Sequence, residues 1–337
     1  MDKSEETINQ ERAETIDMNN RGVLLHMEGE LDEARRTYET VLVRDPDNAT
    51  ALNNLGFVYA QQGKHTEAIR FYRKSLELSK DNVLALVNYA NSQVAEGKVE
   101  SAIGLYERAL EVEPESTIAW DSFAQLMMRL GNPAAAEEAW QNAILTAPEA
   151  VSLYTSLAGA VIMQERLPEG IRILEQAVQL DPELSDAWSQ LGVALFMAED
   201  FPAAKRALRQ ALALEPDDIE VRHHLALVYL GMGDRDTAKR ELLRCLYLEP
   251  DTHAVMVDLA VIELSEGENE KAHEILTTVL QHEADNRRAQ YYYAAVVDLL
   301  GRTDDALELM QTIAREPDLP YAAEAQQYLD EYSKGLH

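Results

Sequence analysis

Side chains that could take part in catalysis occur throughout this 337-residue sequence, but no complete catalytic motif connects them. The segment 63–66, Gly-Lys-His-Thr, resembles the end of a phosphate-binding loop, yet Val58 stands where that motif has its first glycine. His273 and His282 are each followed by glutamate, but neither has the second histidine that a zinc-protease helix requires. We therefore predict neither an enzyme nor a cofactor site.

The only cysteine and the one pair of adjacent histidines do not change this prediction. Cys245 falls on an apolar helical stripe, where a thiol is expected to be a core residue and not a nucleophile. A single cysteine also cannot form a disulfide framework, which favours a reducing compartment such as the cytoplasm. His223 and His224 have no further ligands in sequence, so we predict no metal site.

Hydrogen-bonding side chains that recur every 34 residues point instead to binding. Asn20, Asn54 and Asn88 share one phase of this spacing, and a carboxamide offers both the donor and the acceptor that match a peptide bond. Placed on one face, they could bind a ligand together; simple solvation of these amides is the alternative.

The elements that would position these side chains follow from the same 34-residue period, which runs without insertion from Thr15 to Pro320. In the second unit Leu52, Leu55 and Tyr59 lie on one helical face, and a comparable stripe follows after Gly63. Glycine recurs at this turn in seven units, and proline follows the second stripe in six. Each unit is therefore predicted to be a helical hairpin.

The period also divides the chain into domains. We predict an acidic N-terminal extension at 1–14 and a C-terminal capping helix with a tail at 321–337, in which Ala322, Ala325, Leu329 and Tyr332 share one face. Between them we predict nine repeats, with boundaries 15–48, 49–82, 83–116, 117–150, 151–184, 185–218, 219–252, 253–286 and 287–320.

The repeat at 185–218 carries a family resemblance. Its Trp188, Leu191, Gly192 and Leu195, followed by Ala204, Leu208 and Pro216, resemble the consensus of the tetratricopeptide repeat (TPR) proteins. This resemblance implies an all-α, right-handed superhelical solenoid of helix-turn-helix repeats whose concave groove binds proteins. It also implies that Asn20, Asn54 and Asn88 lie in this groove, where they would form a ladder that holds the main chain of an extended peptide. The other groove residues that the resemblance implies are Phe57, Asn91, Ser122, Gln125, Met128, Ser156, Ile162, Met163, Gln190, Val193, Phe196, Met197 and His224. Two repeats depart from the consensus, because Glu165 and Glu199 occupy the place of the turn glycine.

Charge limits the possible partners. The net charge of -30 and the absence of a basic cluster exclude nucleic acids as ligands, and no apolar run is long enough to enter a membrane. Asp121, Asp186 and Asp258 add acidic groups to the groove, where Arg288 is expected to be isolated. We predict a non-catalytic scaffold or adaptor that binds an extended or helical protein segment, apolar with some positive charge.

Two alternatives remain at this point. Met18, Leu24 and Leu25 at the first repeat are apolar, so the ends of the array could stack into homo-oligomers. The chain could also be an accessory subunit that recruits substrates to an enzyme complex.

Overall fold

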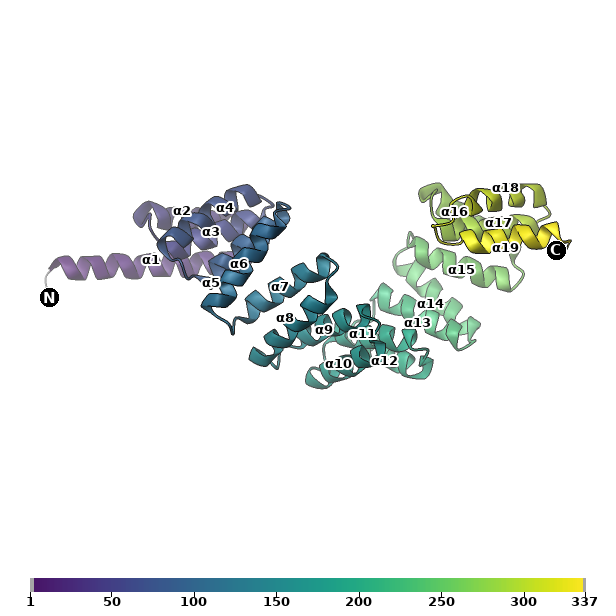
Figure 1. Cartoon of the computed structure of the whole chain (residues 1–337), viewed down its shortest axis with the longest axis horizontal. Coiled ribbons are helices and arrows are strands. Elements are labelled where there is room, and N and C mark those ends of the chain that lie inside the picture. Colours follow the sequence, from purple (N-terminus) through teal and green to yellow (C-terminus); the bar gives the residue numbers. More distant parts are fainter. Residues whose placement is uncertain (1–2, 336–337) are drawn as a thin grey trace. The chain divides into compact units, whose positions relative to one another are not determined.

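The computed structural model describes the backbone of residues 3–335 and the side chains of residues 12–335. This part of the chain contains 19 α-helices and no strand (Figure 1). Part of the predicted N-terminal extension, namely residues 1–2 and the side chains of residues 3–11, lies outside the described residues, as do residues 336–337 of the predicted tail. The chain forms two compact units, residues 1–180 and 181–337.

In each unit, consecutive helices pack as antiparallel hairpins, with odd-numbered helices first and even-numbered helices second. The first unit consists of α1 (Lys3–Met27), α2 (Leu31–Arg44), α3 (Ala49–Gln61), α4 (His65–Leu78), α5 (Val83–Ala95), α6 (Val99–Val112), α7 (Thr117–Arg129), α8 (Pro133–Thr146), α9 (Val151–Met163) and α10 (Leu167–Leu180). The second consists of α11 (Ser185–Met197), α12 (Phe201–Leu214), α13 (Ile219–Gly231), α14 (Arg235–Leu248), α15 (His253–Ser265), α16 (Asn269–His282), α17 (Arg287–Leu299), α18 (Thr303–Ala314) and α19 (Ala322–Ser333).

Local sequence explains where the helices begin and turn. The side chain of Asn48 caps α3 by accepting a hydrogen bond from the Ala51 N–H at 2.9 Å, which satisfies one of the exposed donors of the first turn. The turn between α3 and α4 needs a left-handed residue, which Gly63 provides with φ of 73°. Glu165 and Glu199 keep the same conformation, with φ of 63° and 58°, so the turn survives without glycine at a cost in backbone strain.

A central core residue in each second helix fills the space between the two helices of its hairpin. Where this residue is Tyr72, the facing residue is Gly56, and a Cβ atom added at Gly56 would lie 2.7 Å from the Tyr72 ring. The central residue is 3% exposed or less in every hairpin. It is Tyr38, Tyr72, Tyr106, Trp140 and Leu174 in the first unit, and Leu208, Leu242, Leu276 and Met310 in the second.

The predicted all-α array of hairpins with a closing helix is confirmed. In α19, Ala322 and Ala325 are buried and Leu329 is half-buried, whereas Tyr332 is exposed. Cys245 is fully buried, as expected of a core residue, and burial raises the pKa of its thiol to about 11. Among the described residues, no helix has the length and apolar character needed to cross a membrane.

Candidate functional site

We call one surface of each unit its first-helix face. It consists of those side chains of the odd-numbered helices that do not pack between hairpins. In the first unit this face contains the predicted asparagine ladder, but its three members are not equivalent. Asn20 is exposed, Asn54 is half-buried, and Asn88 is only 7% exposed. Asn88 therefore supports the face from inside and is largely withdrawn from a ligand.

A chain of amide hydrogen bonds explains the burial of Asn88. Its Nδ2 donates to Oδ1 of Asn53 at 3.1 Å, and Nδ2 of Asn53 donates to Oδ1 of Asn54 at 3.3 Å. This bonding occupies Oδ1 of Asn54 and leaves its Nδ2 group, which also lies beside the Tyr38 hydroxyl, as the donor end of the chain. Asn88 and Asn53 are 35 residues apart, so the bond links one repeat to the next.

Buried aromatic side chains hold other polar groups of this face from behind. The Tyr106 hydroxyl donates a hydrogen bond to Oδ1 of Asn91, which leaves the amide nitrogen of Asn91 outward. Burial raises the pKa of Tyr106 to about 12, so its hydroxyl keeps its proton at neutral pH. Burial likewise raises the pKa of Tyr38 to about 12, an increase that the Asn54 side chain beside it partly offsets.

Trp140 determines which group of Gln125 points outward. The indole N–H can only donate, and it reaches Oδ1 of Asp121 at 2.8 Å. The other carboxylate oxygen of Asp121 accepts from Nε2 of Gln125 at 3.0 Å. Because the amide nitrogen of Gln125 is held by a carboxylate, its carbonyl oxygen remains to accept hydrogen bonds from a ligand.

The apolar candidates of the first unit differ in exposure. Met163 is 60% exposed, whereas Phe57 is half-buried, with its ring centroid 5.1 Å from that of His26. Ile162 fills the space beside Gly170, where an added Cβ atom would lie 2.4 Å from it, so Ile162 serves packing as well as the face. Met128, Ser122 and Ser156 are half-buried.

The second unit holds the remaining candidates, Gln190, Val193, Phe196, Met197 and His224. Nε2 of Gln190 donates to Asp186 at 2.8 Å, as in the Gln125 pair, but Leu208 is the central core residue here and offers no donor. Val193 and Phe196 are half-buried, Met197 is exposed, and a ring nitrogen of His224 bonds to a main-chain carbonyl of its own helix. These five residues therefore lie on one face without buried polar support.

The sequence-based view of Asp258 and Arg288 was wrong. Asp258 is only 2% exposed; its carboxylate bonds to Nε2 of His223 at 2.6 Å and to the Arg288 guanidinium. Burial alone would raise the pKa of Asp258, but the hydrogen bonds and charges of these two partners lower it below its usual value. Asp258 thus gives no exposed negative charge, and Arg288 is not isolated.

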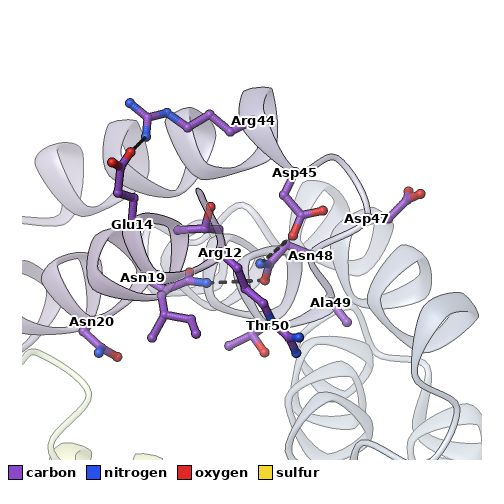
Figure 2. A pocket seen from close by; sticks show the side chains of 12 residues that line it. Arg12, Glu14, Asn19, Asn20, Arg44, Asp45, Asp47, Asn48, Ala49 and Thr50 are labelled. Carbon is purple, nitrogen blue, oxygen red and sulfur yellow. Dashed lines mark hydrogen bonds and ion pairs between the residues drawn. The ribbon is translucent and has the colours of Figure 1, made fainter. Parts of the chain in front are cut away.

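A polar pocket of about 1070 Å³ opens between α1 and the α2–α3 loop of the first unit (Figure 2). Arg44 and Glu14 form an ion pair at 3.2 Å on one side of it. On another side Nδ2 of Asn48 donates to Asp45 at 3.0 Å, and Nδ2 of Asn19 donates to Asn48 at 3.3 Å. The pocket contains Asn20 and thus adjoins the first-helix face.

Sequence reasoning missed the residues that lie behind or between the candidates, namely Asn19, Asn53, Asp258 as a buried group, and Trp140. Bonded partners such as Asn53 with Asn88, and His223 with Asp258, are 35 residues apart. A search for polar pairs at one residue more than the repeat length would have found both.

Several apolar side chains of the first repeat are exposed, namely Ile16, Leu24 and Met27, whereas Met18 and Leu25 are half-buried. Stacking of chains through this end of the array therefore stays a prediction.

Comparison with known proteins gives a consistent result. Sequence models described as tetratricopeptide repeats match residues 13–81; residues 59–126, 195–257 and 263–331; and residues 122–185. No curated protein matches significantly.

Three solved structures share the fold. A chain of the APC/C hetero-tetramer Cut9–Hcn1 is 24% identical, with a TM-score of 0.56, over 72% of this chain and 48% of that one. PilF of Pseudomonas aeruginosa is 17% identical, with a TM-score of 0.53, over 60% and 93%. The C-terminal part of a TPR protein from Cytophaga hutchinsonii is 14% identical, with a TM-score of 0.56, over 71% and 98%. At these identities the likeness concerns the fold alone.

Proposed function

This chain belongs to the tetratricopeptide repeat family, and we propose that it is a non-catalytic scaffold that binds a segment of a partner protein on the first-helix face of its first unit. The observation that carries this proposal is the support of outward polar groups by buried donors. Tyr106 holds Asn91, and Trp140 holds Asp121 and through it Gln125. Groups fixed in this way lose little freedom when a ligand binds.

The donors and acceptors of the face match a peptide main chain. Asn54 and Asn91 present N–H groups to carbonyl oxygens, and Gln125 presents a carbonyl oxygen to an N–H group. Three such bonds contribute about 0.5–1.5 kcal/mol each, whereas micromolar affinity needs about 8 kcal/mol. Apolar contacts must therefore supply the remainder, and the exposed, adaptable side chain of Met163 is suited to this.

Electrostatics favour a segment with some positive charge. Asp121 lies half-buried on the face, and the chain as a whole carries a net charge of -30. A lysine or arginine of the partner placed near Asp121 would be attracted, whereas an acidic segment would be repelled. We infer that the partner segment is mainly apolar and carries at least one basic residue.

Site-specific photo-crosslinking in the native host tests this function. A photoreactive amino acid at Asn91, on the first-helix face, is expected to capture one defined partner. The same group at Glu107, which is exposed on the second helix of the same hairpin, serves as the matched control. Equal capture from both positions, or none from Asn91, would contradict the proposal.

Mutation provides a second test that uses the burial of the amides. Asn54→Ala combined with Asn91→Ala is expected to weaken binding of the captured partner at temperatures well below its melting transition, where the variant is folded although Asn53 and Tyr106 lose their acceptors. Asn88→Ala also loses a buried bond, to Asn53, and is expected to lower the melting temperature without weakening the binding. Unchanged partner binding by the double variant would exclude these amides from recognition.

A further inference from the structure

The polar pocket between α1 and the α2–α3 loop contains a buried acceptor without a partner. Asn19 is 8% exposed, and its Oδ1 makes no hydrogen bond. Buried polar atoms of this kind are rare in folded proteins, because an unmade hydrogen bond costs stability. Asn19 lines the pocket, but this oxygen is covered in the unliganded chain, so a ligand reaches it only after a neighbouring side chain of the pocket moves aside.

The neighbouring residues force the oxygen of Asn19, and not its nitrogen, to be the unpaired atom. The Ala51 N–H can only donate, so Oδ1 of Asn48 faces it at 2.9 Å. Nδ2 of Asn48 then faces the carboxylate of Asp45, which accepts at 3.0 Å. Oδ1 of Asn48 is also the partner of Asn19, which must offer its nitrogen at 3.3 Å (Figure 2). The orientation of Asn19 is therefore set by a donor and an acceptor that cannot reverse.

The next repeat shows how such an acceptor is normally satisfied. Asn53 lies 34 residues after Asn19, and its Oδ1 accepts from Nδ2 of Asn88. Asn54 is the residue that corresponds to Asn88 one repeat earlier, but the oxygen of Asn19 receives no bond from it. The amide oxygen at this repeat position is therefore paired in Asn53 and unpaired in Asn19, which borders the pocket.

The chemistry of the pocket selects a neutral N–H donor. Two basic residues, Arg12 and Arg44, and three acidic residues, Glu14, Asp45 and Asp47, line it, so its charge is nearly balanced. Arg44 already pairs with Glu14, and Asp45 with Asn48. A main-chain amide suits a nearly neutral pocket that offers an acceptor, and the volume of about 1070 Å³ is ample for a short peptide stretch.

We propose that this pocket is the anchor for one end of the bound segment, with a main-chain N–H of the segment donating to Oδ1 of Asn19. This inference rests on the proposed function, because the pocket adjoins the first-helix face through Asn20. It adds a defined contact to that function. Replacing one main-chain N–H of the ligand should weaken its binding only to a chain that carries Asn19.

An ester-substituted peptide tests this contact. A phage-displayed library of random dodecamers is panned on the full chain, and a peptide is kept if the Asn54→Ala, Asn91→Ala double variant binds it more weakly. Each main-chain N–H of that peptide is then replaced in turn by an ester oxygen. One substitution is expected to weaken binding about three- to tenfold to the wild-type chain and to have no effect on Asn19→Ala.

A matched variant separates binding from stability. Asn19→Ala removes an unpaired acceptor together with the 3.3 Å bond to Asn48, whose oxygen keeps its bond from the Ala51 N–H, so the melting temperature is expected to change little while peptide affinity falls. Asn53→Ala, at the equivalent position, removes the partner of Asn88 and is expected to lower the melting temperature. If every ester affects wild type and Asn19→Ala alike, the anchor is wrong while the scaffold function stands. If panning yields no peptide sensitive to the double variant, the scaffold function fails first.

Discussion

The two units support the polar groups of their first-helix faces in different ways. In the first unit, aromatic core residues reach through the hairpin, so that Tyr106 bonds to Asn91 and Trp140 to Asp121. In the second unit the central core residues carry no hydroxyl or indole donor, and Asp258 pairs across repeats with His223 and Arg288. The first unit has one such pair as well, Asn88 with Asn53, beside the groups that are held from the core.

On the first face, polar groups remain that can bond to a ligand. On the second face, the polar groups described above bond to one another. Support from the core leaves the outward half of each amide unpaired, whereas pairing across repeats uses the hydrogen-bonding capacity internally. Both arrangements occur on the same scaffold, so the fold alone does not determine which unit binds. The two faces differ in whether a central core residue offers a hydrogen-bond donor to the face, as Tyr106 and Trp140 do and Leu242 does not.

Arg288→Met should give the largest change in the free energy of unfolding, because it removes an internal ion pair of the second unit. The substitution keeps much of the side-chain volume but leaves the buried carboxylate of Asp258 with His223 as its main partner. We expect a loss of about 3 kcal/mol in the free energy of unfolding, measured by urea denaturation. Arg129→Met, at an exposed arginine of the first unit, should change it by less than about 0.5 kcal/mol. Similar values for both variants would contradict the comparison.

Gly56→Ala should give the next largest effect, because it tests how rigid the aromatic core residues are. The new methyl group would lie 2.7 Å from the Tyr72 ring, and overpacking of this kind costs about 1–3 kcal/mol. Gly192→Ala would place its methyl group 2.5 Å from Cγ of Leu208 and near the Leu208 main-chain nitrogen, so it should cost at least as much.

The control for these glycine substitutions is Gly104→Ala. Gly104 lies within α6 and has open space around it, so alanine should stabilise the helix by about 0.5–1 kcal/mol. Calorimetry of the three variants ranks them, and a Gly56→Ala chain as stable as wild type would show that the Tyr72 ring yields to the added methyl group.

Tyr106→Phe and Trp140→Phe should have smaller effects on stability. Each removes one donor to a polar group of the first-helix face, and for Tyr106→Phe this should lower the free energy of unfolding by about 1 kcal/mol. Trp140→Phe also leaves buried volume empty and should cost about 2 kcal/mol. Peptide affinity should fall as well, because Asn91 or Gln125 is then free to rotate. Isothermal titration with a panned peptide checks this, and unchanged affinity would show that support from the core does not prepare the face.

Acidification should reveal the smallest difference. The pKa of Asp258 lies below its ordinary value of 3.8 in the folded state, so the stability from its charge is present above that pH and is lost as the pH falls through the lower, folded-state pKa. The fall in melting temperature between about pH 5 and pH 3 should therefore be larger, by about 2–4 °C, for wild type than for Asp258→Asn. Circular dichroism measures it, and an equal fall in both would contradict the ionised pair.

Much of the fold could be predicted from the 34-residue period, because each helix must present its apolar stripe to its neighbours. The first helices from Ala49 to Arg287 begin at intervals of 34 residues. Even Glu165 and Glu199, which depart from the consensus, adopt the left-handed turn, since the packing of the flanking helices leaves no other path. The regular pattern therefore overrides an unfavourable local residue.

The candidate site was less predictable, because exposure depends on which residue of the next repeat lies opposite. Asn20, Asn54 and Asn88 are identical in type and phase, yet their exposure differs from high to almost none. Asn88 is covered because Asn53 is long enough to meet it, and Asp258 is covered because His223 and Arg288 flank it. A one-dimensional period does not contain these contacts between repeats.

The hairpin packing also bears on synthesis of the chain. Within each unit, helices pack on those adjacent or next but one in sequence, so contacts are local and loop-closure entropy is small. A hairpin emerging from the ribosome can therefore fold before the following one is translated, and it exposes a single apolar edge at a time. Nascent chains of this protein should need little chaperone assistance for their length.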